Sequence, residues 1–147
     1  HSVRKFADKP VEKELIDTII RIAETAPSSK NTRSSAFMII EDRDTIAAIS
    51  EMRDSGSSFV KDAPAVIVVM GDESKTDLWV DNCAISTTFI QLAAMELGSC
   101  WVHVNGRPRS RTDMSAGNAE DYLRELLGVK DGIRILCVVA LGYPAEN

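Results

Sequence analysis

The chain has 147 residues and a formal net charge of −5 at pH 7, from 17 lysines and arginines against 22 aspartates and glutamates. This length suits one domain with its own core and no disulfides. The mildly acidic balance argues against a broad electrostatic contact with nucleic acid or an anionic membrane.

Cysteine usage and the amino end bear on location. The three cysteines are an odd number within apolar stretches, which argues against a disulfide framework and predicts a reducing, cytoplasmic compartment. No basic segment followed by an apolar one opens the chain, so no export signal is predicted. The chain begins at His1 without a methionine, so we expect the natural amino end to be missing. The weakly charged stretch 78–97 contains seven polar side chains, which favours a buried helix over a membrane span.

The first half of the chain predicts two helices and two strands. Pro10 precedes apolar residues at helical spacing that stop at Pro27, which predicts a helix over 11–24. Short apolar runs predict strands over 36–40 and 65–70, and residues 45–53 between them predict an amphipathic helix.

The second half predicts the same alternation. A long helix over 77–97, capped by Asp77 or Thr76 and closed by Gly98, is apolar on more than one side, which is typical of a core or a subunit interface. Strands are predicted over 99–104 and 133–141. The helix between them spans 119–127, with Asn118 as its cap and Gly128 at its end, and residues 106–117 form one long polar loop.

The alternation of strands and helices alone predicts a doubly wound α/β domain, residues 1–147, with a parallel sheet. No strand is followed by a turn like GxGxxG or GxxxxGK[ST], so a dinucleotide fold or a P-loop has no support.

Two segments carry donors that suit a phosphate or a polar ring. In extended backbone Ser2 and Arg4 share one side and can address one ligand, although a frayed, solvated terminus is the alternative. The segment Pro27-Ser28-Ser29-Lys30-Asn31 follows a helix end, and by itself it is equally a plain turn.

Two further groups of residues are candidate sites. Cys100 and His103 lie three residues apart on a predicted strand and therefore point to opposite faces, so we expect no metal site. Arg107, Arg109 and Arg111 alternate in the long loop; they suit the phosphates of NAD(P)H, and a solvated mobile loop is the alternative.

Five segments occur in one order over essentially the whole chain: His1-Ser2-x-Arg4-x-Phe6, Pro27-Ser28-Ser29-x-Asn31, Phe37-Met38-Ile39-Ile40, Leu97-Gly98 and Leu141-Gly142-Tyr143-Pro144. Together they resemble the FMN-dependent nitroreductase family. The resemblance implies an α+β, three-layer fold, with a central sheet of four to five mostly antiparallel strands flanked by helices. It also implies a homodimer formed through the long central helix 77–97.

The resemblance further implies two FMN sites at the dimer interface, each built from both subunits. His1, Ser2 and Arg4 would line the flavin of their own subunit. Residues for the partner's flavin would be Pro27, Ser28, Ser29 and Asn31. Backbone N–H groups of the segment that lies against the ring would approach flavin N5, and the matching residues here are Val104, Asn105 and Gly106.

The activity implied is ping-pong hydride transfer from NAD(P)H through flavin N5 to a small-molecule acceptor such as a nitroaromatic or a quinone, with no catalytic side chain assigned. Arg4 is the expected cation near N1 and C2=O of the reduced flavin. Alternatives on the same fold are an enone or flavin reductase, a dehalogenase, and a flavin-binding homodimer without turnover. Neither a nucleic acid nor a membrane is an expected partner.

Three positions depart from the family pattern. Ser34-Ser35 stands where many members have Pro-Trp, and the first arginine of the opening pattern would precede His1. The basic pair that many members use for the phosphate would follow Gly142-Tyr143-Pro144, beyond Asn147. We therefore expect either a missing carboxyl-terminal segment or a larger share of phosphate binding by the opening residues.

Overall fold

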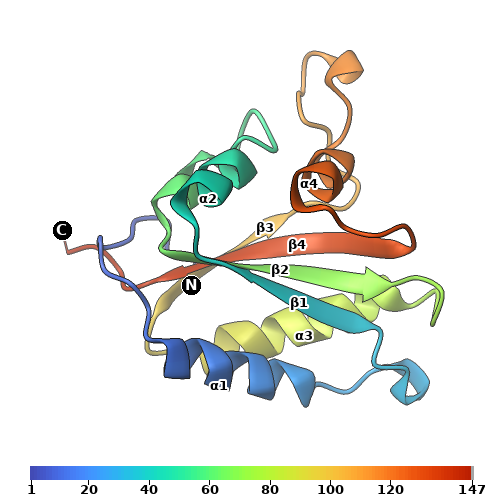
Figure 1. Ribbon diagram of the computed structural model, residues 1–147, viewed down its shortest axis with the longest axis horizontal. Coiled ribbons are helices and arrows are strands. Elements are labelled where there is room, and N and C mark those ends of the chain that lie inside the picture. Colours follow the sequence, from blue (N-terminus) through green and yellow to red (C-terminus); the bar gives the residue numbers. More distant parts are fainter. Residues whose placement is uncertain (147) are drawn as a thin grey trace.

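A four-stranded sheet in the order β1-β2-β4-β3 is the middle layer of the structure, a computed structural model that describes residues 1–146. The strands are β1 (Ser35–Ile40), β2 (Ala65–Asp72), β3 (Gly98–His103) and β4 (Ile133–Gly142). Helices α1 (Lys13–Glu24) and α3 (Trp79–Ala93) cover one face, and α2 (Arg43–Ser50) and α4 (Ala119–Leu127) lie on the other (Figure 1). This is the α+β, three-layer arrangement that the family resemblance implies.

Every pair of neighbouring strands is antiparallel, so the parallel sheet predicted from alternation alone is wrong. Helix α2 is only eight residues long, about 12 Å, and the chain re-enters the sheet at the end where β1 left it. Helix α4 behaves in the same way between β3 and β4 (Figure 1). Only α3 returns the chain along the sheet, and β4 then inserts between β2 and β3.

The sheet is buried on both faces, which explains the nearly continuous apolar runs of its two central strands. Side chains of β2 alternate, so that Val66 and Val68 pack toward α2 and α4 while Ile67 and Val69 pack toward α1 and α3. The register of β2 against β4 shifts between Val69 and Met70, which leaves Leu136 as an extra residue in a β-bulge.

The predicted end of the long helix is wrong. Helix α3 ends at Ala93, and Gly98 is the first residue of β3 rather than a helix terminator. A Cβ at Gly98 would lie 2.7 Å from Cγ1 of Val3, so the glycine admits the amino-terminal segment beside β3. At the other end α3 begins at Trp79, and the Thr76 hydroxyl accepts a hydrogen bond from Leu78 N.

The bounds and caps predicted for α4 are confirmed: Asn118 accepts from Asp121 N, and Gly128 ends the helix in the left-handed conformation. The polar loop before α4 projects from the body as an arm, residues 107–117, at the top of Figure 1. Its neck is closed by hydrogen bonds from Arg109 N to Gly117 O and from Ala119 N to Arg107 O. Within residues 1–146, no helix has the length and apolar character needed to cross a bilayer.

Candidate functional site

The amino-terminal segment, residues 1–6, continues the sheet instead of fraying. Val3 N donates to Ser99 O at 2.9 Å, and Ala145 N donates to Lys5 O at 3.0 Å. Phe6 forms a bridge with Pro144 and is 9% exposed. The chain therefore holds this segment against the start of β3 and the end of β4.

The polar side chains of this segment face different hollows. His1 and Ser2 line a groove of about 820 Å³ with the carboxyl-terminal half of α3, including Gln91 and Leu92. Arg4 instead lies beside Asp62, with its guanidinium carbon 5.9 Å from the Phe59 ring centroid. The structure thus separates Ser2 from Arg4, which the sequence placed on one side of a single ligand.

The loop with Pro27, Ser28, Ser29 and Asn31 is organised by a residue outside it, Asn82 of α3. The Asn82 side chain is 2% exposed and accepts from Ser29 N at 3.0 Å. Its amide nitrogen, with two N–H donors, lies within hydrogen-bond distance of three hydroxyl oxygens of the loop, those of Ser29 at 3.2 Å, Thr32 at 3.4 Å and Ser34 at 2.9 Å. One buried amide therefore ties the loop to the amino-terminal half of α3.

The same loop holds backbone conformations that side-chain-bearing residues rarely adopt. Lys30, Asn31 and Arg33 have φ values of 49°, 54° and 48°, and such conformations are expected at ligand-binding sites when the surroundings impose them. Ser28 Oγ accepts from Arg33 N at 3.0 Å, while Pro27 and Asn31 are exposed. The two serines shape the loop, and Asn31 is left free to meet something outside it.

The turn of Val104, Asn105 and Gly106 follows β3, and two of its N–H groups are already used. Val104 N and Asn105 N both donate to the carbonyl of Leu136, at 2.9 and 3.0 Å, because the β4 bulge turns this carbonyl toward them. Val104 is fully buried, whereas Gly106 has a φ of 74° with open space around its Cα. Gly106 is the residue of this turn for which an approach to a flavin stays open.

The open edge of β3 offers main-chain groups that the sequence analysis missed. Ser99 O accepts from Val3 and therefore points away from β4. Alternate residues of a strand share this direction, so the N–H groups of Trp101 and His103 also point to the open edge. The rings of these two residues stack at 6.3 Å on one face of the strand, opposite the buried Cys100.

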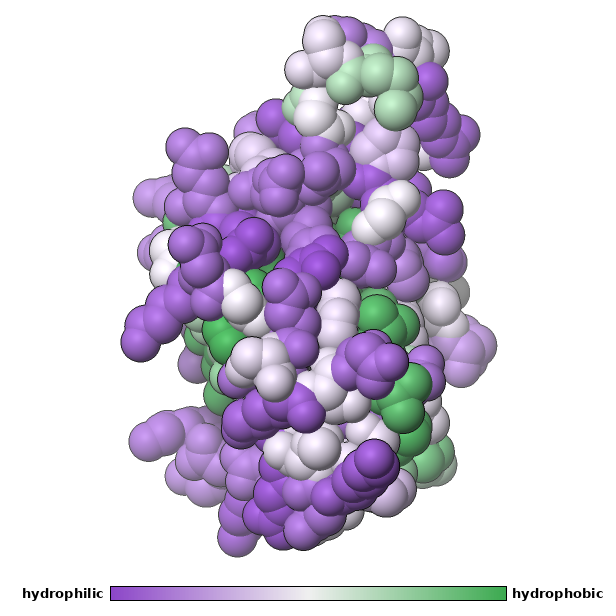
Figure 2. All heavy atoms as spheres, turned by 90° about the vertical axis from the view of Figure 1, so that its right-hand side faces the viewer, coloured by the Kyte–Doolittle hydropathy of each residue, from purple (hydrophilic) through white to green (hydrophobic). Residues whose placement is uncertain are grey.

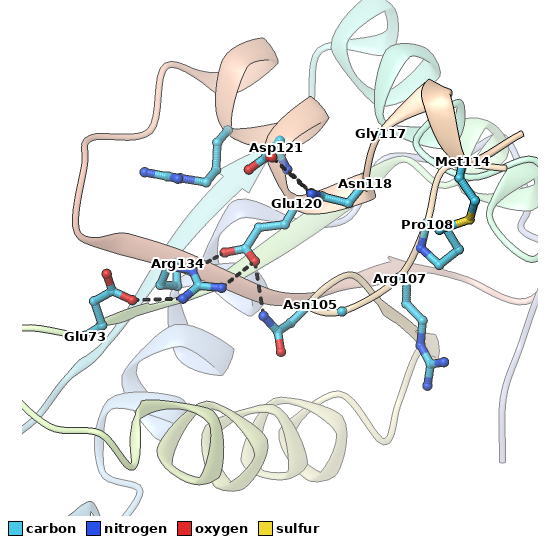
Figure 3. Close-up of a pocket in the computed structure, with 12 residues that line it drawn as sticks. Glu73, Asn105, Arg107, Pro108, Met114, Gly117, Asn118, Glu120, Asp121 and Arg134 are labelled. Atoms are coloured by element: carbon cyan, nitrogen blue, oxygen red, sulfur yellow. Dashed lines mark hydrogen bonds and ion pairs between the residues drawn. The ribbon is translucent and has the colours of Figure 1, made fainter.

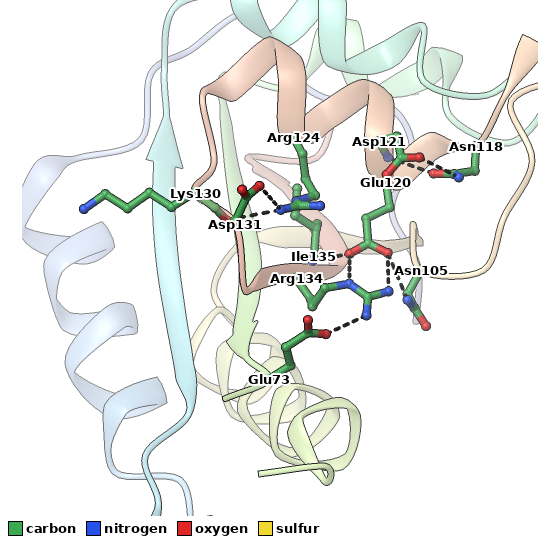
Figure 4. A network of polar contacts seen from close by, with 10 residues as sticks. All are labelled: Glu73, Asn105, Asn118, Glu120, Asp121, Arg124, Lys130, Asp131, Arg134 and Ile135. Atoms are coloured by element: carbon green, nitrogen blue, oxygen red, sulfur yellow. Dashed lines mark hydrogen bonds and ion pairs between the residues drawn. The ribbon is translucent and has the colours of Figure 1, made fainter. Parts of the chain in front are cut away.

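Behind the turn lies a network of charged groups (Figure 4). Arg134 of β4 binds Glu120 of α4 through two bonds of 2.7 and 2.9 Å, and it also binds Glu73 at 2.8 Å. Glu120 accepts further bonds from Ile135 N at 3.0 Å and Asn105 Nδ2 at 3.1 Å. Burial disfavours the charge of Glu120, but these bonds outweigh it and hold the pKa of the carboxyl below its usual range.

The network forms one wall of a hollow of about 680 Å³ between α4, the end of β3 and the arm (Figure 3). Arg107 and Pro108 line its opposite side, with Met114 of the arm tip. Charged and polar residues predominate on the side of the molecule shown in Figure 2. The paler green patch at its top is the arm tip, where Met114 is 76% exposed. Because its charges are paired with one another, the network fixes the turn rather than offering a free acid or base.

The cysteines do not suit nucleophilic chemistry. All three are free and buried, and burial raises the pKa of Cys83 to about 11 and that of Cys137 to about 12. Within residues 1–146, no three His, Cys, Asp or Glu side chains gather as ligands for a metal ion.

The ten residues proposed from the sequence do not line one cavity. His1 and Ser2 lie beside the carboxyl-terminal end of α3, whereas the 27–31 loop is tied to its amino-terminal half. The exposed side of α3 between these ends combines the polar Asp81 and Thr88 with large apolar side chains, of which Ile85 is 37% and Leu92 60% exposed. The helical spacing of Asn82 from Ser86 could have indicated a buried polar face, but nothing in the sequence paired Asn82 with the loop.

Comparison with known proteins gives one consistent result. The model of the nitroreductase family matches residues 1–55 and 50–143. A curated protein of Archaeoglobus fulgidus, provisionally named an NADH dehydrogenase/NAD(P)H nitroreductase, is 34% identical over 99% of this chain and 82% of its own length. An iodotyrosine deiodinase of Danio rerio is 43% identical over 99% of this chain and 58% of its own length. The solved structure of an FMN-dependent nitroreductase from Clostridium difficile R20291 superposes with a TM-score of 0.93 at 36% identity, over 100% of this chain and 84% of that chain.

Proposed function

The chain belongs to the nitroreductase family, and on that premise we propose that it is an FMN-dependent NAD(P)H oxidoreductase that acts as a homodimer. The observation that supports this proposal is that two groups of the expected flavin-binding residues lie at opposite ends of α3, His1 and Ser2 at one end and the 27–31 loop at the other. We take each group as one half of a flavin site and call the two groups half-sites.

A second copy completes both half-sites by symmetry. If two α3 helices pack antiparallel about a two-fold axis, the amino-terminal end of one lies beside the carboxyl-terminal end of the other. The 27–31 loop of one subunit then approaches His1 and Ser2 of its partner. The exposed apolar side chains of α3, with Ile85 and Leu92 among them, supply the surface that such a contact needs.

The residues around the β3 edge fit the polar parts of FMN. The outward N–H groups of Trp101 and His103, with that of Gly106, suit acceptor atoms of the isoalloxazine ring. Arg4 carries an exposed guanidinium for the pyrimidine end or the phosphate, and Ser2 offers a hydroxyl. Asn31 and Pro27 of the partner would cover the ring from the other side.

Bound FMN supplies a carrier that accepts hydride from NAD(P)H and passes it to an acceptor in a second step. The chain's own part is to fix the ring at the edge of β3, to place N–H dipoles and Arg4 where negative charge develops, and to leave one ring face open. The reaction needs no side chain at this edge that acts as a general acid or base with a shifted pKa. The acceptor is a nitroaromatic, a quinone or a similar small molecule.

The similarity to a deiodinase favours reductive dehalogenation as the second candidate. Both candidates use the same bound flavin and differ in the groups around the open ring face. A halogenated phenol and a nitroaromatic, offered to the reduced protein in parallel, separate the two by which of them reoxidises the flavin.

The visible spectrum of the purified protein, recorded anaerobically before and after NADPH or NADH is added, tests the proposal. We expect a yellow protein whose flavin absorbance bleaches with at least one of the two donors. A yellow protein inert to both would be a flavin binder without turnover, and a protein that takes up no FMN would overturn the proposal. Size-exclusion chromatography with light scattering should give a dimer.

A further inference from the structure

Three arginines gather beside the end of β3, where the arm meets the turn after α2. Arg53 reaches the β3 backbone, with Nη1 3.4 Å from His103 O. The next residue, Asp54, anchors the arm: its N–H donates to Arg109 O at 2.7 Å, and its carboxylate accepts from Arg111 N at 3.0 Å. These bonds bring Arg107 and Arg111, at the base of the arm, close to Arg53.

The middle arginine of the arm has a different task from its two neighbours. The Arg109 guanidinium lies 3.9 Å from the Tyr122 ring centroid and donates to Glu51 O at 3.0 Å. It is half-buried and fastens the arm to the body, whereas Arg107 and Arg111 on either side of it are exposed. Of the three alternating arginines of the arm, Arg109 therefore anchors the arm, and Arg107 and Arg111 carry exposed guanidinium groups.

Within residues 1–146, none of the three arginines forms an ion pair, although the Asp54 carboxylate partly offsets the charge of Arg53. Between residues 1 and 146, the carboxylates within 4.0 Å of a guanidinium belong to the pairs of Arg43, Arg124 and Arg134. Burial lowers the pKa of Arg53, and the charges of Arg107 and Arg111 lower it further, opposed by Asp54. Burial, Arg107 and Arg53 likewise hold the pKa of His103 below its usual value, which keeps that ring neutral at pH 7.

Three guanidinium groups around the single carboxylate of Asp54 leave an excess of positive charge that a bound anion would relieve. The hydrogen bond to His103 O holds the side chain of Arg53 at the end of β3, whereas the side chains of Arg107 and Arg111 are exposed to solvent.

We propose that Arg53, Arg107 and Arg111 form a binding site for the phosphate monoester of a nucleotide, and that this nucleotide is the phosphorylated electron donor, NADPH, recognised through its 2′-phosphate. This inference rests on the proposed function. Guanidinium groups bind phosphate through paired, charge-assisted hydrogen bonds. NADH lacks this group, so the site makes the protein selective between the two donors.

The position of the cluster favours the exchanging donor over the resident flavin as the source of the phosphate. Ser99, beside the amino-terminal segment, and His103, beside Arg53, are four residues apart along β3, about 13 Å. A flavin whose phosphate is held by the opening residues would leave the arginine cluster to a second nucleotide. Exposed groups on a projecting arm also suit a ligand that arrives and leaves in every turnover.

The test compares the FMN-loaded wild type with the double variant Arg107→Ala/Arg111→Ala. Both residues are exposed, and the hydrogen bonds that hold the arm here come from their main-chain atoms, so the arm should stay in place. We expect kcat/KM for NADPH to fall by about tenfold or more, with kcat/KM for NADH changed less than about twofold. The control Lys13→Ala/Arg21→Ala removes the same charge from the exposed face of α1. It should leave kcat/KM for NADPH and kcat/KM for NADH unchanged.

A binding measurement on the oxidised, FMN-loaded protein gives a result that does not depend on turnover. By calorimetry, 2′-AMP should bind the wild type about tenfold more tightly than the double variant, while 5′-AMP serves as the probe for phosphate in another position. Equal binding of 2′-AMP to both proteins, or an equal loss of activity with NADPH and NADH, would overturn the inference. Loss of FMN from the double variant with an unchanged ratio of NADPH to NADH activity would also overturn it, because the cluster would then hold the flavin's own phosphate.

Failure of the proposed function would be distinguishable from failure of this inference, because neither NADPH nor NADH would then bleach the flavin of the wild type.

Discussion

At the scale of single residues, Asn82 determines the shape of a loop that lies some fifty residues before it. Its carboxamide is buried; the oxygen accepts from Ser29 N, and the two N–H donors are shared among three hydroxyl oxygens of residues 29–34. The loop holds Lys30, Asn31 and Arg33 in backbone conformations with positive φ, which are strained for residues with a side chain. A loop of this kind keeps its conformation only while the supporting side chain is present.

Replacing Asn82 with alanine should therefore weaken FMN binding more than it weakens the fold. The half-buried N–H of Ser29 would lose its acceptor, at a cost of about 1 kcal/mol, and the loop would relax away from the strained conformation. We expect about a tenfold rise in the FMN dissociation constant, measured by quenching of flavin fluorescence.

Thr87→Val is the matched control for this variant. Thr87 is equally buried on the same helix, but its hydroxyl bonds only Cys83 O and Cys137 Sγ. Asn82→Asp keeps an acceptor for Ser29 N and should recover much of the affinity. If the valine and alanine variants lose FMN to the same extent, Asn82 is an ordinary core residue and not a support for the loop.

At the scale of elements, the pairing of the amino-terminal segment with β3 depends on the absence of a side chain at Gly98. A Cβ there would meet Cγ1 and Cβ of Val3 at 2.7 and 2.8 Å, closer than atoms can approach without a shift. The segment that carries His1, Ser2 and Arg4 can therefore lie this close to β3 only because residue 98 has no side chain.

Gly98→Ala should push the segment away from β3 and reduce FMN retention while the circular dichroism spectrum stays native. Val3→Gly added to Gly98→Ala removes Cβ as well as the two methyl groups that clash, so the double variant should regain flavin. The flavin-to-protein absorbance ratio after gel filtration measures both. Retention of full flavin content by Gly98→Ala would show that the segment does not touch the cofactor.

Glu120 joins three elements, since it binds Arg134 of β4, Ile135 N and the Asn105 side chain after β3. Its pKa in the folded protein is lowered from the ordinary 4.5. The unfolded chain therefore binds its proton first as the pH falls, and the stabilisation present at neutral pH is lost below about pH 4.5.

Glu120→Gln should lower the free energy of unfolding at pH 7 by about 2 kcal/mol and flatten its decline between pH 5 and pH 3. Urea denaturation at several pH values measures both effects. Glu125→Gln, on the exposed side of the same helix, is the control and should leave the curve unchanged. Parallel pH dependences for the wild type and Glu120→Gln would contradict the linkage.

At the scale of the whole molecule, the exposed side of α3 separates the two half-sites and suits a second copy of the chain. Five exposed large hydrophobic residues lie on α3 or next to it: Leu78, Val80, Ile85, Leu92 and Met95. An isolated subunit would leave this surface in water and the flavin site half built.

Ile85→Glu should therefore yield monomers and release FMN together, because burying the new carboxylate in the dimer is unfavourable. Leu126→Glu on α4 is a control of similar exposure, 39% against 37% for Ile85, and should remain dimeric and yellow. Light scattering and the flavin spectrum are read on the same samples. A monomer that keeps its flavin would show that one subunit suffices for the site.

The sequence by itself determined the elements and the family. Periodic apolar residues gave the helices and strands, since burial on one or two faces leaves a pattern in the chain. Local chemistry fixed the ends of α4, because Asn118 and Gly128 act on their immediate neighbours. The ordered segments from His1 to Pro144 were enough for the resemblance that the comparisons confirmed.

The tertiary structure alone decided strand direction, the role of Gly98 and the contacts that support the loop, the turn and the arm. The direction of a strand depends on the end of the sheet to which the preceding helix returns the chain. Parallel and antiparallel sheets can show the same alternation of strands and helices along the sequence, so the alternation does not distinguish them. Asn82 and Ser29, like Arg53 and His103, meet across some fifty residues, and no local pattern records such a pair. Propensity and periodicity act over a few residues, whereas a binding site is assembled from distant ones by packing.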